Sequence, residues 1–508
     1  MSSKFTRRDF LKIAAGASML PVLGKLPVQL NQPSLQGKTQ PNIIVILLDA
    51  LSATNLSLYG YPRKTSSAME KLAGRSIVYH AHHAACNSTA PSTASLFSST
   101  YPWKHRVFNF NGMVNPQVQP INLLKLLPKD YYQAALVQNF YADVLIYQFS
   151  EEMDRRLGPD TAGMVGKTIY NHLFPKDALF GAKAYDQVIF DAKENPASLF
   201  SALLVKFKRE FGMVDAAREM KDLYPEGLPF LKTSDTYFTI DQVMGSAGDM
   251  LKTLPAPFFA YVHFMPPHSP YRPGRDFLGT FDDGWAPEQK KFHPLATKRA
   301  PEVLNRARQK YDEFIANLDA ELGKLLDNLE KSGVLENSYL ILTADHGDMF
   351  ERGQQGHVNS FLFEALTQVP LIISTPGQRE RRDIYTTTSN TDLMPTLLNI
   401  TGGSVPDNIE GRLLPGLGGE DSTDRSIFSV EASNNSAFKP LKKATIAMWR
   451  GPYKMIRYSG YKHYNGYELY DLQSDPGEVN DLYGSLPISS ELQAEMDASI
   501  NQADEPYR

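Results

Sequence analysis

Residues 42–49 read NIIVILLD, an unbroken run of aliphatic residues that stops at an acid. A strand with one solvated face would alternate between apolar and polar residues, so this run is typical of a strand buried on both faces of a parallel sheet. In open α/β sheets, ligands bind beyond the carboxyl ends of the strands. The stretch therefore predicts a parallel sheet and places Asp49 at its functional edge.

Strand-like and helix-like segments alternate as far as about residue 400. Candidate strands are residues 77–79, 132–137, 257–264, 338–344 and 369–373, and candidate helices are residues 67–74, 303–329 and 392–398. This alternation predicts a doubly wound α/β fold, with a mostly parallel sheet flanked by helices.

After Gly402 the pattern changes to short strands and turns. The strand candidates are residues 426–430, 444–449 and 453–458, and a turn-rich stretch covers residues 468–478. We expect a main α/β domain over residues 41–402 and a small α+β C-terminal subdomain over residues 403–508. Residues 145–248 carry no usable motif, and we expect an insertion there that could shape substrate access.

The composition excludes several classes of protein. The 508 residues carry a net charge of only -4, whereas a nucleic-acid surface needs a basic excess. Cys86 is the only cysteine, so no internal disulfide, zinc finger or iron–sulfur cluster can form.

The N-terminus has the form of an export signal. Residues 6–12, TRRDFLK, precede a short apolar run at residues 13–23. That run is too short to span a bilayer, which takes ~20 apolar residues. The paired arginines resemble a twin-arginine signal, although a chance pair on an ordinary helix is the alternative. We expect residues 1–31 to direct export to the periplasm or beyond, and we expect no transmembrane segment.

A candidate nucleophile lies in residues 86–97, CNSTAPSTASLF. Pro91 suits the first turn of a helix, where its missing N–H costs nothing. A hydroxyl on Ser88 or Thr89 would then lie at the helix N-terminus, which favours an anion. Ser and Thr are also ordinary N-cap residues, so this stretch alone does not establish a site.

Other polar residues follow the later strands. Asp345 and His346 come after residues 338–344 and offer a carboxylate and an imidazole to one metal, although a capped turn is the alternative. His268 lies in a proline-rich loop that would hold its side chain in place, and His357 follows a Gly-Gln loop. A packed loop histidine is the alternative reading for both.

Taken together, these segments resemble the sulfatase family, within the alkaline phosphatase-like superfamily. The segments that resemble the family are residues 42–49, 89–96, 263–271, 311–329, 343–348, 392–398 and the closing ELYDLQSDPGEVNDL at residues 468–482. They run in family order over nearly the whole chain after residue 40. The resemblance implies a metal-dependent hydrolase of sulfate or phosphate esters.

The chain departs from the family at several site positions. Sulfatases usually carry a Cys or Ser that is oxidised to formylglycine, whereas the family register here points to Thr89. The other departures are Ala50 for an aspartate, Thr93 for an arginine, and Asn139 and Tyr141 for a lysine and a histidine. This pattern is similar to the phosphoethanolamine and phosphoglycerol transferases and to phosphodiesterases of the superfamily.

No formylglycine is expected, because the methyl group of a threonine blocks oxidation to an aldehyde. Cys86 lies three residues too early in the register; a modified Cys86 or Ser88 is the competing interpretation.

The resemblance and the strand-end positions together assign the site. The expected ligands of one divalent ion (Mn, Zn, Mg or Ca) are Asp49, Thr89, Asp345 and His346. Mixed carboxylate and imidazole ligands favour manganese or zinc. Thr89 is also the expected nucleophile, and His268 and His357 are expected to steady the anion or protonate the leaving oxygen.

Several other histidines and one further aspartate are not expected to take part in catalysis or to bind the metal. We interpret His263 as structural or as a support for the ligands, and Asp348 as a turn residue. His80, His82 and His83 have metal-like spacing, but we interpret them as surface or packing residues.

Three functions are consistent with these residues. The first is an exported hydrolase acting on a small-molecule, glycan or lipid ester; the second is a soluble phosphotransferase that moves a head group onto a glycan or lipid. The third is a catalytically dead binding protein, suggested by the residues that depart from the family pattern. We favour the hydrolase, because the expected nucleophile and ligands are retained together. The sequence does not set the oligomeric state.

Changing both Arg7 and Arg8 to lysine is expected to trap the precursor in the cytoplasm, because the twin arginines carry the signal. Cell fractionation with immunoblotting measures this. Unchanged appearance of the double variant outside the inner membrane would contradict the export signal.

Overall fold

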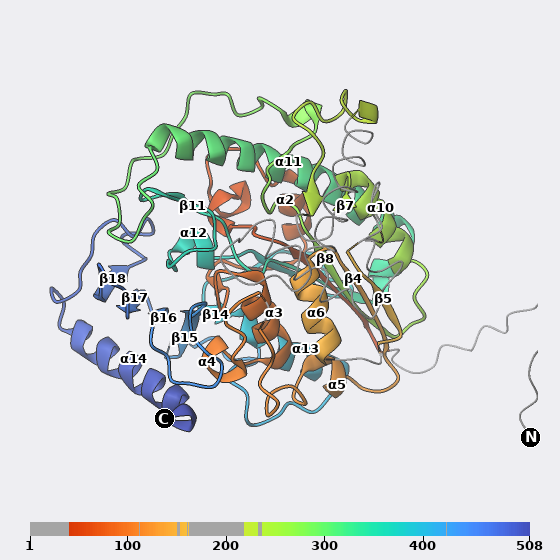
Figure 1. The fold of residues 1–508 in the computed structure, drawn as a ribbon. Coiled ribbons are helices and arrows are strands. Elements are labelled where there is room, and N and C mark those ends of the chain that lie inside the picture. The colour runs from red at the N-terminus through yellow and green to blue at the C-terminus, as the bar shows by residue number, and fades with distance from the viewer. Residues whose placement is uncertain are drawn as a thin grey trace, which may run out of the picture. The chain divides into compact units, whose positions relative to one another are not determined.

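Strand β1 (Asn42–Leu48) lies inside an eight-stranded sheet in the computed structural model of the chain (Figure 1). The strand order is β13 (Arg382–Ile384), β2 (Ile77–Tyr79), β12 (Leu371–Ser374), β9 (Ser338–Thr343), β1, β8 (Phe258–Phe264), β4 (Tyr132–Val137) and β5 (Arg155–Leu157). β12 runs antiparallel to both of its neighbours, and every other pair is parallel. The mostly parallel sheet expected from the sequence is confirmed.

The structure describes residues 40–110, 112–149, 153–159, 161, 218–231, 236–422 and 424–508. The expected signal at residues 1–31 and much of the expected insertion at residues 145–248 lie outside these ranges. Residues 40–508 form one compact unit. Within the described ranges, no helix has the length and apolar character needed to cross a membrane.

Both faces of β1 are buried, as its sequence requires. Ile44, Ile46 and Leu48 join a core with helices α2 (Ser67–Ala73), α10 (Ile240–Leu251) and α11 (Pro301–Lys331). The alternate residues Ile43, Val45 and Leu47 join a second core with α3 (Thr89–Ser98), α5 (Leu123–Leu126), α6 (Phe140–Phe149) and α13 (Leu393–Thr401). Figure 1 shows these two groups of helices on opposite sides of the sheet.

A smaller antiparallel sheet follows in the C-terminal part. Its strands, in order, are β15 (Ser426–Glu431), β16 (Ala444–Arg450), β17 (Tyr453–Ser459) and β18 (Gly466–Asp471). Helix α14 (Ile488–Asp504) packs Leu492, Met496 and Ile500 into the core of this part. The turn expected from residue 468 begins only after Asp471, because the buried Leu469 is paired with Met455 in the sheet.

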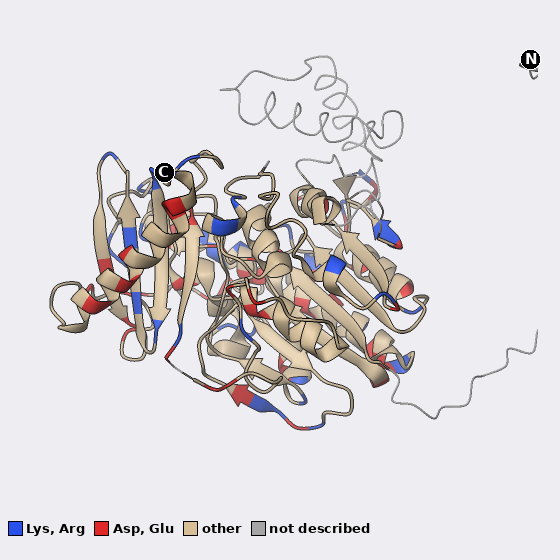
Figure 2. Ribbon diagram, turned by 90° about the horizontal axis from the view of Figure 1, so that it is seen from below, with Lys and Arg blue, Asp and Glu red and all other residues tan. Residues whose placement is uncertain are grey.

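Short 3-10 helices, together with some short strands and α-helices, complete the described chain. The short strands and α-helices are β3 (His82–His83), α4 (Pro102–His105), β6 (Phe230–Leu231), β7 (Thr236–Tyr237), β10 (Phe350–Glu351), β11 (Gln354–Gln355), α12 (Glu364–Thr367) and β14 (Thr388–Ser389). Acidic and basic residues are interspersed along the ribbon in Figure 2, in keeping with the small net charge of -4.

A buried ion cluster joins the small sheet to α12. Lys454 on β17 is fully buried and lies 2.8 Å from Glu364 and 2.7 Å from Glu478. On the other side of α12, the N–H of Gly347 donates to Leu366 O at 2.7 Å. A Cβ at position 347 would lie 2.2 Å from Ala365 O, so only glycine allows this approach. The C-terminal part thus buttresses the turn that carries Asp345 and His346.

Candidate active site

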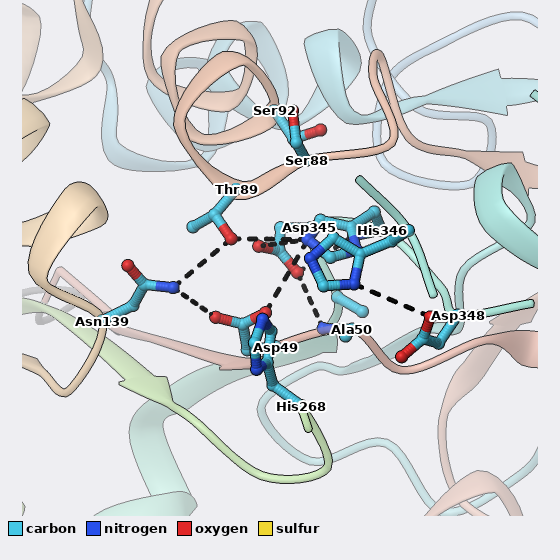
Figure 3. Close-up of polar contacts among 12 residues, drawn as sticks. Asp49, Ala50, Ser88, Thr89, Ser92, Asn139, His268, Asp345, His346 and Asp348 are labelled. Atoms are coloured by element: carbon cyan, nitrogen blue, oxygen red, sulfur yellow. Dashed lines mark hydrogen bonds and ion pairs between the residues drawn. The ribbon is translucent and has the colours of Figure 1, made fainter. Parts of the chain in front are cut away.

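Two buried carboxylates define the site. Asp49 and Asp345 follow the adjacent parallel strands β1 and β9, so the sheet itself brings them together (Figure 3). Asp345 Oδ1 accepts hydrogen bonds from the N–H groups of Ala50 at 3.1 Å and His346 at 2.9 Å. Asp49 Oδ1 and Asp345 Oδ2 have no hydrogen-bond partner within the described residues. Two buried, unpaired carboxylate oxygens are suited to a cation.

His346 presents a lone pair to those oxygens. Its Nδ1–H donates to Gly347 O at 2.9 Å, which leaves Nε2 as an acceptor. Nε2 lies 3.5 Å from Asp345 Oδ2, 3.7 Å from Asp49 Oδ1 and 3.3 Å from Thr89 Oγ1. Ligand atoms held at about 2.0–2.2 Å around a tetrahedral ion are separated by about 3.4 Å. His346 Nε2 therefore lies within 3.3–3.7 Å of one oxygen from each of the other three sequence-predicted ligands, close to that separation.

His263, interpreted from the sequence as structural or as a support for the ligands, lies close enough to be a further candidate ligand. Its Nε2 lies 3.3 Å from Asp49 Oδ2, and its Nδ1 lies 3.1 Å from the Tyr261 hydroxyl. Potential ligand atoms of Asp49, His263 and Asp345 all lie within 4.8 Å of one another. The register pairs His263 with Leu47, near the end of β1.

Burial and charge set the protonation of the two acids. Burial raises the pKa of Asp49, but the electrostatic contacts with His268, His263 and His346 and the hydrogen bond with His263 outweigh burial and lower the pKa below its usual range. Burial also raises the pKa of Asp345, and the neighbouring charge of Asp49 raises it further. Within the described part of the chain, no lysine or arginine pairs with either carboxylate. A cation between the two acids would supply the missing positive charge.

The nucleophile candidate opens helix α3. Thr89 is the first residue of α3 and is buried, and its hydroxyl points into the site in Figure 3. The Asn139 amide, which follows β4, donates to Thr89 Oγ1 at 3.3 Å and to Asp49 Oδ2 at 2.6 Å. The sequence had marked Asn139 only as a departure from the family pattern, because a side-chain amide carries no signal of its own.

The two expected acid–base histidines lie beside this cluster. The His357 ring lies 4.3 Å from that of His346 and 4.8 Å from that of His268, measured between centroids. His357 Nδ1 is 3.7 Å from Asp348 Oδ1, and the Tyr271 hydroxyl donates to Asp348 Oδ2 at 2.5 Å. Asp348, interpreted from the sequence as a turn residue, therefore also faces His357.

The pKa values of the two histidines are shifted in opposite directions. Burial lowers the pKa of His268 to about 4, so its imidazole is neutral near pH 7. Burial also lowers the pKa of His357, but its contact with Asp348 outweighs burial and raises the pKa above the usual value. His357 is therefore the better proton donor of the two.

The remaining candidates lie outside the cluster. Burial raises the pKa of the Cys86 thiol to about 12, so it stays protonated, and its nearest polar contacts are to Asn87 and Ser88. The three clustered histidines have separate partners: His80 pairs with Asp383, His82 with Thr388 and Asn390, and His83 with Glu364.

The chain matches two family models and resembles several known proteins. The family model described as Sulfatase matches residues 41–403, and the model described as N-sulphoglucosamine sulphohydrolase, C-terminal, matches residues 353–505. A choline-sulfatase of Rhizobium meliloti is 24% identical and aligns over 87% of this chain and 82% of its own length. A Delta 4,5-hexuronate-2-O-sulfatase of Bacteroides thetaiotaomicron is 21% identical over 93% and 91% of the two chains.

A solved structure shares the fold. The phosphonate monoester hydrolase of Agrobacterium radiobacter superposes with a TM-score of 0.63 at 20% identity, over 91% of this chain and 95% of its own. The likeness supports the alkaline phosphatase-like fold expected from the sequence.

Changing Asp345 to Asn is expected to remove a bound divalent ion while the fold persists, because one of the two charged ligands is lost. Metal analysis of the dialysed protein measures this, with circular dichroism as the test of folding. Asp383→Asn, at an exposed carboxylate, is the matched control. Stoichiometric metal in the Asp345 variant would show that the ligand assignment is wrong.

Proposed function

The chain belongs to the sulfatase family, and on that premise we propose that it is a metal-dependent hydrolase that cleaves sulfate or phosphate esters through Thr89. The observation that carries the proposal is the position of the Thr89 hydroxyl, 3.3 Å from both His346 Nε2 and Asn139 Nδ2, beside the unpaired oxygens of Asp49 and Asp345. The similar proteins named for choline-sulfate, hexuronate-sulfate and phosphonate-ester hydrolysis support a small-molecule ester as substrate.

The metal would be held by Asp49, Asp345 and His346, with Thr89 and His263 within reach. A bound divalent ion would supply positive charge that favours loss of the hydroxyl proton and stabilises charge on the ester oxygens. The carboxylate and imidazole donors suit manganese or zinc.

The chain's own residues then define two displacements. In the first, the proton of Thr89 Oγ1 passes to solvent and Oγ1 bonds to the sulfur or phosphorus, while the bond to the leaving oxygen breaks and that oxygen takes a proton from His357. In the second, water bonds to the same centre and its proton returns to Thr89 Oγ1 as that bond breaks. Threonine needs such activation, because its hydroxyl is a weak nucleophile at its ordinary pKa.

His357 is the proton donor in this scheme. Its contact with Asp348 favours the imidazolium form, and its ring lies against that of His346. His268 is neutral near pH 7 and donates its Nδ1–H to Ser269 O at 2.7 Å, so its Nε2 is a hydrogen-bond acceptor. It would hold an anion only after Nε2 takes up a proton.

Export through the twin-arginine route is part of the same proposal, supported by Arg7 and Arg8 in residues 6–12. Folded export would allow the metal to be loaded before transport.

Changing Thr89 to Ala is expected to abolish turnover while bound metal is retained, because the nucleophile is lost but two carboxylates and an imidazole remain. Cys86→Ala, the matched change three residues away, is expected to keep most activity. Initial rates on p-nitrophenyl sulfate, phosphate, phosphonate and phosphodiester substrates, with metal analysis, measure this. Activity surviving Thr89→Ala, or an aldehyde at Cys86 or Ser88 by peptide mass spectrometry, would overturn the assignment.

Changing His357 to Gln is expected to slow esters of alkyl alcohols by about 10²–10⁴-fold, because these leaving oxygens need a proton. Esters of p-nitrophenol, a stable anion, should slow much less. The wild-type rate on alkyl esters should fall as the pH rises and the imidazolium is lost, and the variant should lack this fall. Equal losses on both ester classes would exclude His357 as the acid.

A further inference from the structure

The side-chain amide of Asn139 is held in one orientation by helix α6. Asn139 is 6% exposed and directly precedes α6, whose first free N–H groups face its side chain. Asn139 Oδ1 accepts from the Tyr141 N–H at 2.9 Å and from the Ala142 N–H at 3.5 Å. This is the pattern of an N-cap residue, in which a side-chain oxygen satisfies backbone donors that have no partner in the helix.

The cap directs the amide NH₂ group into the site. Asn139 Nδ2 lies 2.6 Å from Asp49 Oδ2 and 3.3 Å from Thr89 Oγ1 (Figure 3). The reversed amide would set its oxygen against the Asp49 carboxylate and its NH₂ against two backbone N–H groups. Partners on both sides therefore fix which atom faces Thr89.

We propose that Asn139 is a positioning residue that fixes the Thr89 hydroxyl relative to Asp49 and the rest of the candidate metal cluster. The inference rests on the proposed function, in which Thr89 is the nucleophile. The Asn139 amide contacts both Asp49 and Thr89, and its orientation is fixed by the cap on α6. The direction in which Thr89 Oγ1 faces the ester therefore depends on α6. The amide N–H can donate to Thr89 Oγ1 before and after the hydroxyl loses its proton.

Asn139 also bears on the charge of the ester that the site accepts. The amide is neutral, and within the described residues no lysine or arginine pairs with Asp49 or Asp345. The two carboxylates balance the charge of one divalent ion, so little positive charge remains for a second negative charge on the substrate. We expect singly charged sulfate esters and phosphodiesters to be better substrates than doubly charged phosphate monoesters.

Asn139→Ser tests the positioning role. Serine is a good N-cap and adds no charge, but its side chain is too short to bridge Asp49 and Thr89. The expected result is a fall in kcat of about 100-fold, with KM changed by less than about threefold. Asn122→Ser is the matched control, because Asn122 Oδ1 caps α5 through the Lys125 N–H at 3.1 Å, away from the candidate cluster. Its activity should match wild type.

Asn139→Lys tests the effect of charge. The measured quantity is kcat/KM for p-nitrophenyl phosphate, which is doubly charged, divided by that for methyl p-nitrophenyl phosphate, which is singly charged. Lysine should raise this ratio by about tenfold or more relative to wild type, a change that loss of packing alone would not produce.

The outcomes separate the two proposals. An active wild type, an inactive Thr89→Ala and an Asn139→Ser with wild-type kcat would overturn the inference and leave the proposed function standing. A loss in Asn139→Ser that appears equally in Asn122→Ser would assign the effect to helix capping and overturn it as well. Activity that survives Thr89→Ala would overturn the proposed function and the inference together.

Discussion

The structure depends on two carboxylates of like charge buried side by side. Asp49 and Asp345 lie at the ends of adjacent strands, and each leaves one oxygen without a partner within the described residues. Burying such groups costs several kcal/mol per ion unless opposite charge or hydrogen bonds compensate. The groups around them are suited to this constraint: the Asn139 amide donates to Asp49, backbone N–H groups donate to Asp345, and the His346 lone pair faces both acids.

The sheet and the surrounding helices and turns contribute different residues to the site. The sheet supplies the acids, because parallel strands end at the same edge. The helices and turns supply the other groups: Thr89 at the start of α3, Asn139 before α6, and His346 on a turn held by α12. The buried ion cluster around Lys454 ties that turn to the C-terminal sheet, so the smaller part of the molecule supports the site without contributing a candidate ligand.

The sequence predicted the strands of the sheet well. It predicted less well the side chains whose positions depend on strand register, a helix cap or a loop. The bounds of β1 and β4 match the candidate strands, and both strands have β-branched or aliphatic residues on both faces toward their carboxyl ends. The strand-end rule and the family resemblance together pointed to Asp49 and Asp345, which the structure places on adjacent strands. His263 could not be placed beside Asp49, because that requires knowing that β8 pairs with β1 and in which register. The orientation of Asn139 depends on the α6 cap, and the pairing of Asp348 with His357 depends on a loop, so neither follows from local pattern.

The burial of two acids of like charge also helps to decide whether the site is catalytically active. Burying two acids of like charge costs several kcal/mol per ion when nothing compensates, so a protein that kept the fold only for binding would gain stability by replacing them with apolar residues. This chain instead has neutral groups where its family pattern has cations, at Thr93 and Asn139, while both acids, a lone-pair histidine and a hydroxyl still converge. Loss of cations alone would leave the acids less compensated and the fold less stable. The arrangement is therefore better explained by a site that still needs its acids to hold a cation, and this favours the hydrolase over the binding protein.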